Sequence, residues 1–177
     1  MRADAQRNRA RVLEAAIEVF EARGIGASTD EIARAAGVGT GTVFRHFPTK
    51  EDLLSAVFLA RLERLAVQAR SLGESDDPVA ALETFFTTTV SQAATKNSLV
   101  EALTALGAPV PSSGSDLRAA LEVLLSRAQK AGGIRSDIRL ADLMSLLVGA
   151  SRAVEHLGPH SDAHDRVIGV IFAGLRA

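Results

Sequence analysis

The chain has 177 residues, of which 47% are hydrophobic and 23% charged, and its formal net charge at pH 7 is −1. This composition supports one large globular domain or two small ones, and the absence of cysteine excludes a disulfide framework and a thiolate site. No apolar run reaches the roughly 18 residues of a membrane span, and the basic N-terminus lacks the apolar core of a signal peptide. We therefore expect a cytoplasmic protein without a membrane partner.

Apolar residues recur at helical spacing along the chain, and no run of alternating strands is visible. The first helix carries an apolar stripe from Val12 to Phe20 and ends at Gly24. Short helices follow over residues 29–36 and 40–47, and a long fourth helix extends from the cap Thr49 to about residue 70. Further helices are expected from residue 78 onward and over residues 97–106, 116–130, 140–157 and 162–175. The sequence thus predicts an all-α fold of about nine helices.

Only Gly37, Val38 and Gly39 separate the second and third helices, which is the short glycine-containing turn of a helix-turn-helix. Gly37 suits the left-handed conformation that such a turn needs, and Ala33 is small enough for a close helix crossing. The third helix, TGTVFRHF, is short and half polar. Short hydroxyl side chains and a glycine would allow it to approach a DNA duplex closely, so this helix is typical of one that enters a major groove.

Charge adds modest support for a nucleic-acid partner. Residues 1–50 carry a balance of +2 and residues 51–177 a balance of −3, and arginines crowd the start of the chain at Arg2, Arg7, Arg9 and Arg11. Helix-turn-helix geometry also occurs in proteins that never bind DNA. A helical interaction module with a vestigial helix-turn-helix therefore remains an alternative at this point. An enzyme is the other alternative, but the sequence contains no G-x-S-x-G, phosphate loop, H-E-x-x-H or convincing carboxylate pair, so we expect no catalytic residues and no cofactor.

The first 54 residues resemble the DNA-binding domain of the TetR family of bacterial transcriptional regulators. The resemblance rests on RVLEAAIEVFEARGIGASTDEIARAAGVGTGTVFRHFPTKEDLL, in which Ile32-Ala33, Ala36-Gly37-Val38 and His46-Phe47 stand in the family's order. It implies a DNA-binding domain over residues 1–48 and a helical ligand-binding and dimerisation domain over residues 49–177. It also implies a repressor-like homodimer that binds a palindromic operator and releases it when a small molecule binds.

The resemblance assigns roles to individual residues of this chain. It places the recognition side chains toward bases or backbone at Thr40, Gly41, Thr42, Arg45 and His46. It places Thr29, Phe44 and Lys50 near phosphates, with the amide groups at the start of the fourth helix as further phosphate donors. The family commonly has tyrosine where this chain has Phe44, so a phosphate hydrogen bond is lost there and Phe44 is expected to pack only. The N-terminal arginines are expected either to reach the DNA backbone or minor groove or to form a disordered arm.

The last two expected helices, SLLVGASRAV and RVIGVIFAGL, are apolar and contain small residues, which fits either an intramolecular core or a four-helix dimer interface; the resemblance favours the interface. Pocket-lining candidates in the C-terminal part are Phe86, Thr89, Gln92, Thr104, Arg152 and Glu155. Arg152 and Glu155 are three residues apart and are expected to pair with each other. His156, His160 and His164 repeat every four residues, but Gly158 and Pro159 interrupt the helix, so we expect no metal site.

Overall fold

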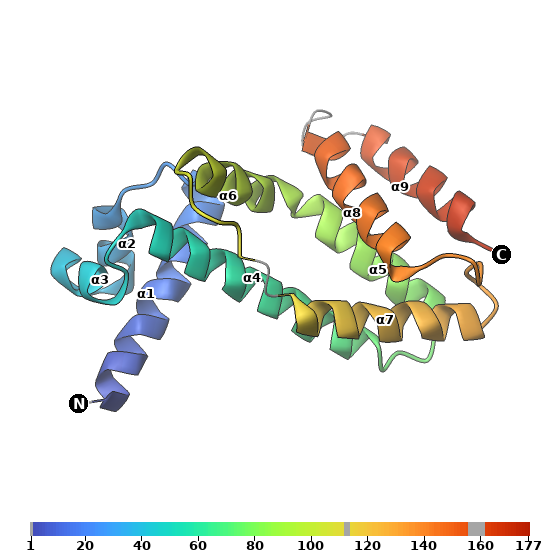
Figure 1. Cartoon of the computed structure of the whole chain (residues 1–177), viewed down its shortest axis with the longest axis horizontal. Helices are drawn as coiled ribbons and strands as arrows, with labels where there is room; N and C mark the ends of the chain where they lie inside the picture. Colours follow the sequence, from blue (N-terminus) through green and yellow to red (C-terminus); the bar gives the residue numbers. More distant parts are fainter. Residues whose placement is uncertain (1, 112–113, 156–161) are drawn as a thin grey trace. The chain divides into compact units, whose positions relative to one another are not determined.

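The computed structural model describes residues 2–111, 114–155 and 162–177, and in these ranges the protein forms nine helices and no strand (Figure 1). The helices are α1 (Arg2–Arg23), α2 (Thr29–Ala36), α3 (Thr40–His46), α4 (Lys50–Leu72), α5 (Pro78–Ser91), α6 (Ala93–Ala105), α7 (Ser115–Lys130), α8 (Leu140–Glu155) and α9 (Asp162–Leu175). The predicted all-α fold is confirmed. None of the helices in these ranges is both long enough and apolar enough to cross a membrane.

Most helix boundaries follow from local capping chemistry. Ser28 accepts a hydrogen bond from the backbone N–H of Glu31, and the Glu31 carboxylate accepts one from the N–H of Ser28, which together form a capping box at the start of α2. Thr49 and Asp52 make the same reciprocal pair at the start of α4. Asp77 accepts from the N–H of Ala80 at 2.9 Å before the first residue of α5. These sequence-local signals explain why the predicted starts of α2, α4 and α5 are correct.

Two boundaries differ from the sequence-based expectation. Helix α6 begins at Ala93 instead of residue 97, so the loop expected between α5 and α6 shrinks to Gln92. Gln92, the residue before this start, is not one of the usual N-cap residue types, which is why the pattern alone did not find it. Helix α1 extends back to Arg2, although its apolar stripe begins only at Val12. The expectation of a disordered N-terminal arm is therefore wrong for residues 2–11, which continue the helix.

By backbone contacts the chain divides into two compact units. The N-terminal unit comprises residues 1–61 and 95–112, and the C-terminal unit comprises residues 62–94 and 113–177. In the N-terminal unit α1, α2 and α3 contact one another (Figure 1). Their shared core is built from apolar side chains that are at most 5% exposed, namely Val12, Ala16, Ile17, Phe20, Ile32, Ala33, Ala36, Val43 and Phe47. The predicted domain boundary at residue 48 stays a prediction.

The C-terminal unit has a larger core, in which α5 packs against α7 and α8 and α9 packs against α8. Phe86 of α5 and Phe172 of α9 meet edge to face, with ring centroids 5.4 Å apart. The end of the chain is fixed to the loop after α7, because the N–H of Arg135 donates to the carbonyl of Leu175 at 2.9 Å. This unit is therefore a packed helical bundle with its last helix held at both its core and its end.

Candidate nucleic-acid interface

The turn between α2 and α3 has the predicted geometry. Gly37 adopts the left-handed conformation with φ 64°, and the N–H of Val38 donates to the carbonyl of Ala33 at 3.0 Å, which closes α2. Gly39 then precedes the first residue of α3 in an extended conformation. Val43 of α3 is 1% exposed and anchors the third helix to the core of the unit. The helix-turn-helix predicted from the spacing is therefore present.

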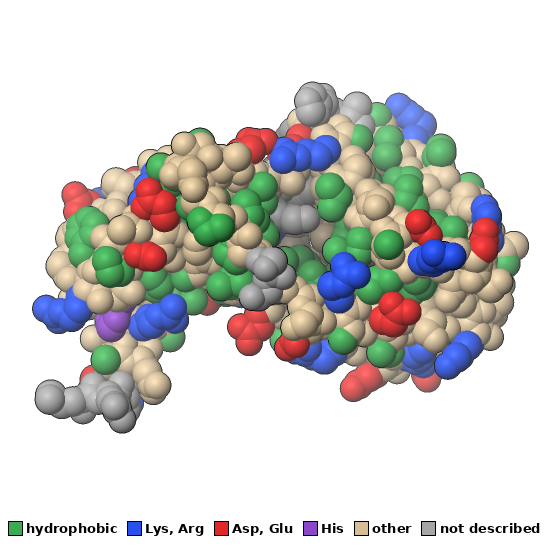
Figure 2. Space-filling model, in the orientation of Figure 1, with side chains coloured by type: hydrophobic (Ala, Val, Ile, Leu, Met, Phe, Trp, Pro, Cys, Tyr) green, Lys and Arg blue, Asp and Glu red, His purple; other side chains and the backbone are tan. Residues whose placement is uncertain are grey.

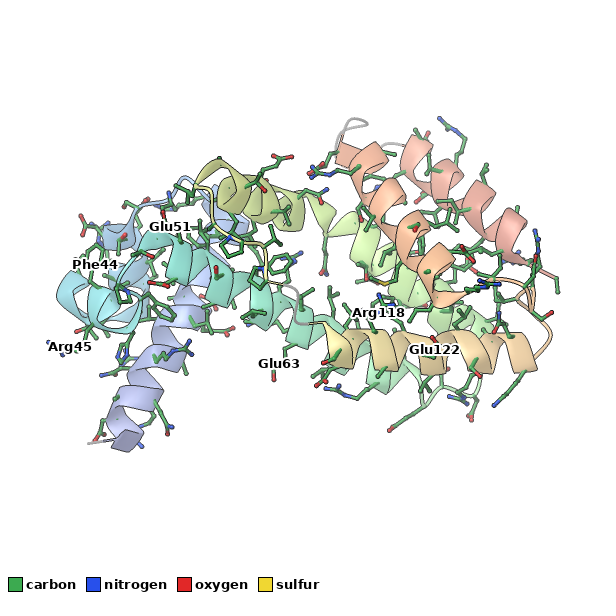
Figure 3. The ribbon with its side chains drawn as sticks, viewed as in Figure 1. Phe44, Arg45, Glu51, Glu63, Arg118 and Glu122 are labelled. Carbon is green, nitrogen blue, oxygen red and sulfur yellow. The ribbon has the colours of Figure 1, made fainter. Side chains whose placement is uncertain are left out.

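Helix α3 has an inner and an outer face. Val43 and Phe47 lie one helical turn apart and are buried, whereas Gly41, Phe44 and Arg45 are exposed. Figure 3 shows Phe44 and Arg45 projecting outward from the ribbon of α3. Phe44 is 49% exposed, and the expectation that it packs only stays a prediction. Half of this large apolar residue therefore remains on the surface of α3, where another molecule could contact it.

The outer face of α3 has room for close approach. A Cβ atom added at Gly41 would meet no other atom within 4 Å, so packing inside the protein does not require a glycine there. Glycine within a helix costs roughly 1 kcal/mol relative to alanine. Arg45 has no hydrogen-bond or ion-pair partner among the described side chains. A small residue beside an unpaired guanidinium suits a surface that a negatively charged polymer approaches.

The remaining predicted recognition residues differ in their surroundings. Thr42 and His46 are half-buried on α3, and Thr29 is half-buried at the first position of α2. Thr40 is also half-buried, and its hydroxyl donates to the Asp30 carboxylate at 2.9 Å. These side chains lie on the α2–α3 part of the unit.

Lys50 is exposed at the first position of α4. Two of the backbone amides beside it already donate to acceptors within the protein. The N–H of Thr49 donates to Asp52 at 3.1 Å, and the N–H of Asp52 donates back to the Thr49 hydroxyl at 3.1 Å. These capping bonds use two donors at the start of α4, and a phosphate contact of Lys50 stays a prediction.

Arg9 and Arg11, two of the arginines at the start of the chain, contact the end of α2 and the residue after α3. Arg11 donates to the carbonyl of Ala36, the last residue of α2, at 2.7 Å. The guanidinium of Arg9 lies over the ring of Phe47, 5.0 Å from its centroid. Arg7 pairs with Asp4 on the same helix. The sequence did not predict these contacts of Arg9 and Arg11, because their partners lie 25 or more residues away in the chain and no local pattern indicates them.

The start of α2 is fixed electrostatically as well. The pKa of Glu31 is lowered from 4.5 to about 2, first because its carboxylate accepts the backbone N–H of Ser28 and then because it is bonded to Arg23. The carboxylate therefore stays ionised at the positive end of the helix at any neutral or mildly acidic pH. This ion pair and the capping box hold the first turn of α2 in place beside α3.

Two family models match the chain. One, described as bacterial regulatory proteins of the tetR family, matches residues 12–57. The other, described as the C-terminal domain of SbtR-like transcriptional regulators, matches residues 77–177, which is more than half of the chain. The chain belongs to the TetR family. The resemblance read from the first 54 residues is thereby confirmed.

Solved structures of TetR regulators match this chain over nearly its whole length. A TetR transcription regulatory protein from Mycobacterium vanbaalenii is 43% identical, with a TM-score of 0.77 and 99% of both chains covered. The TetR regulator SCO0520 from Streptomyces coelicolor is 31% identical, with a TM-score of 0.75 and coverage of 95% of this chain and 98% of that chain. The TetR family consists of DNA-binding transcriptional regulators and not of enzymes.

Among curated proteins the match is confined to a short stretch. The HTH-type regulator SrpR of Pseudomonas putida is 47% identical over 60 residues, which are 33% of this chain and 28% of SrpR. TtgW from the same species is 47% identical over 60 residues, which are 45% of its length. The match thus spans less than half the length of these curated relatives.

The pocket candidates of this TetR-family chain differ in their surroundings. Phe86 is 1% exposed and belongs to the core of the C-terminal unit, and Thr89 is buried on the same helix, with a hydroxyl that has no hydrogen-bond partner among the described residues. Gln92 is exposed. Thr104 is also exposed, belongs to the N-terminal unit, and donates its hydroxyl to the carbonyl of Val100 at 2.8 Å.

Arg152 and Glu155 form the expected pair, with 3.3 Å between Nη1 and Oε2. Of the three histidines considered for a metal, His156 and His160 lie outside the described residues. Within the described ranges no group of histidine, aspartate and glutamate side chains is arranged to hold a metal ion.

Proposed function

We propose that this TetR-family regulator is a homodimeric repressor that binds a palindromic operator through α3 and leaves it when a small molecule occupies the C-terminal unit. The observation that carries the DNA-binding part is the outer face of α3, where Gly41 is open to solvent between the exposed side chains Phe44 and Arg45. Such a regulator acts where bacterial DNA lies, in the cytoplasm.

In this proposal the recognition residues divide by chemistry. Arg45 reads guanine through its paired donors, and Thr42 and His46 contact neighbouring base edges. Lys50 and Thr29 contact phosphates, because each is the first residue of its helix. Phe44 has no hydroxyl for a phosphate, so its ring packs on a sugar or on a thymine methyl group. Arg9 and Arg11 act indirectly by holding α3 and the turn.

Fluorescence anisotropy with labelled operator DNA tests these roles. Arg45→Ala should weaken operator binding by roughly tenfold and relax the preference at one base pair in each half-site. Lys50→Ala should weaken all duplexes alike and make the salt dependence shallower by about one counterion per protomer. Arg118→Ala, which removes an exposed arginine from α7 (Figure 3), is the matched control and should change neither property. Unchanged affinity in both test variants would remove α3 and Lys50 from the interface.

The homodimer is proposed to form through α8 and α9. Gly149, Gly169 and Gly174 are exposed, and a Cβ atom at any of them would meet nothing within 4 Å. Packing within the protomer therefore does not require these glycines, although each weakens its helix. Val148 is 49% exposed and Val170 is 74% exposed on the same two helices. Figure 2 shows hydrophobic and uncharged surface over much of α8 and α9 in this view. A second copy would bury these valines, and the glycines would let the helices approach closely.

The effector site is proposed in the C-terminal unit, with Thr89 as its best-supported residue. A buried hydroxyl without a partner costs stability unless a ligand or water satisfies it. Arg152 and Glu155 form an ion pair with each other, so their opposite charges balance, which favours an effector without net charge. A screen for small molecules that release labelled DNA tests this part of the proposal. Thr89→Val should fold normally and lose the response, whereas retention of the full response would remove Thr89 from the site.

A further inference from the structure

The hydroxyl of Thr40, at the first position of α3, is already committed inside the protein. Its Oγ1 lies 2.9 Å from Oδ1 of Asp30 in the first turn of α2. An ionised carboxylate accepts hydrogen bonds and has none to donate, so the single proton of the hydroxyl points at Asp30. What remains on Oγ1 for any other partner is acceptor capacity alone.

The local structure of α2 holds Asp30 in place for its hydrogen bond with Thr40. The first turn of α2 is fixed by its capping box, because Glu31 is bonded both to the N–H of Ser28 and to Arg23. Asp30 lies within this anchored first turn of α2, and α2 packs against α3. Asp30 is therefore held beside Thr40 before any DNA arrives.

The polarity of Thr40 determines which groups of DNA it can contact. Phosphate oxygens, guanine O6 and N7, and thymine O4 are acceptors, and an oxygen that can only accept gains nothing from them. The amino groups of adenine and cytosine are the donors in the major groove. We propose that Asp30 is a specificity-determining residue, which fixes Thr40 as an acceptor and so selects an adenine or cytosine amino group at one position of each half-site. This inference rests on the proposed DNA-binding function.

Three variants and the wild type, each incubated with a pool of randomised duplexes, test the inference. Asp30→Ala frees the proton of Thr40, so guanine should become accepted at that position, with a change of roughly threefold to tenfold in relative affinity. Thr40→Val keeps the shape and deletes the hydroxyl, so the preference should disappear without a gain of guanine. In Asp30→Ala/Thr40→Val the loss of Asp30 should have no further effect, because Asp30 acts through Thr40.

Thr84→Val is the matched control, because it removes the same hydroxyl group at an exposed position of α5, in the C-terminal unit. It should leave the adenine or cytosine preference at the Thr40 position intact. An unchanged preference in Asp30→Ala, or an equal effect of Asp30→Ala with and without Thr40, would overturn the inference. If the folded wild type enriches no sequence at all, the proposed function itself fails, and this result is distinct from the first two.

Discussion

The outer face of α3 and the outer faces of α8 and α9 both expose glycines that their own protomer does not require. A Cβ atom would meet nothing within 4 Å at Gly41 in α3 or at Gly149 and Gly169 in α8 and α9. The neighbours of these glycines differ. Around Gly41 lie hydroxyl side chains and Arg45, which has no partner in the described part of the chain, whereas Val148 and Val170 are exposed on α8 and α9. The same helix-weakening residue therefore indicates two different partners, a charged duplex for α3 and an apolar protein surface for α8 and α9.

The largest effect on assembly and on operator affinity is expected for a substitution in α9. Gly169→Leu should prevent close approach of two protomers, convert the dimer to monomers, and lower operator affinity on the order of 100-fold, because the two half-sites are then bound separately. Light scattering after gel filtration measures the mass, and anisotropy measures the affinity. Ala119→Leu, an equally large change at an exposed position of α7, should leave both unchanged. A dimeric Gly169→Leu would move the interface away from α9.

Gly41→Ala tests whether the glycine in α3 is needed for close approach to DNA. Alanine should raise the free energy of unfolding by up to about 1 kcal/mol, since it favours the helix and meets no neighbouring atom. It should nevertheless weaken operator binding by roughly tenfold, the size of one lost base contact. Thermal unfolding and anisotropy on the same sample separate the two effects. Gly26→Ala, in the loop before α2, is the control with unchanged affinity, and a stabilised Gly41→Ala that binds normally would contradict close approach at this residue.

Arg11→Ala separates a structural arginine from a DNA-contacting one. The loss of its bond to the carbonyl of Ala36 should lower the free energy of unfolding by about 1 kcal/mol. Operator affinity should fall by less than tenfold, and the salt dependence should stay the same, because no phosphate contact is lost. Arg7→Ala removes an exposed arginine one turn away, and its surface ion pair contributes little to stability. A shallower salt dependence in Arg11→Ala would instead place this guanidinium on the DNA.

The smallest expected effect is on the pH dependence of the free energy of unfolding. Glu31 has a pKa of about 2 in the folded protein against an ordinary value of 4.5, so its contribution to stability is complete above pH 4.5 and is lost as the pH falls through 2. Glu31→Gln removes this titration, and its free energy of unfolding should therefore depend less on pH between 4.5 and 2. Urea unfolding at several pH values measures the slope. Glu63→Gln, an exposed position of α4 (Figure 3), should keep the wild-type slope.

The sequence predicted the parts of the fold that depend on neighbouring residues. Ser28, Gly37 and Pro48 mark the limits of α2 and α3, and the structure has both helices within one residue of the expected bounds. Contacts between distant residues were not predictable. The bonds from Arg11 to Ala36 and from Thr40 to Asp30 depend on how the helices cross, and no spacing in the chain encodes them. For the same reason, periodicity could not decide that Thr89 is buried and Gln92 exposed on neighbouring turns.

We propose that α3 reads DNA as part of a two-fold dimer. Selection of bound sequences from randomised duplexes by the wild-type protein at moderate salt tests it most directly. We expect an inverted repeat whose half-sites are about 10 base pairs apart, or a multiple of this, so that two recognition helices enter major grooves on one side of the duplex. Enrichment of a single unpaired half-site would contradict the dimer, and no enrichment by the folded protein would contradict DNA recognition by α3.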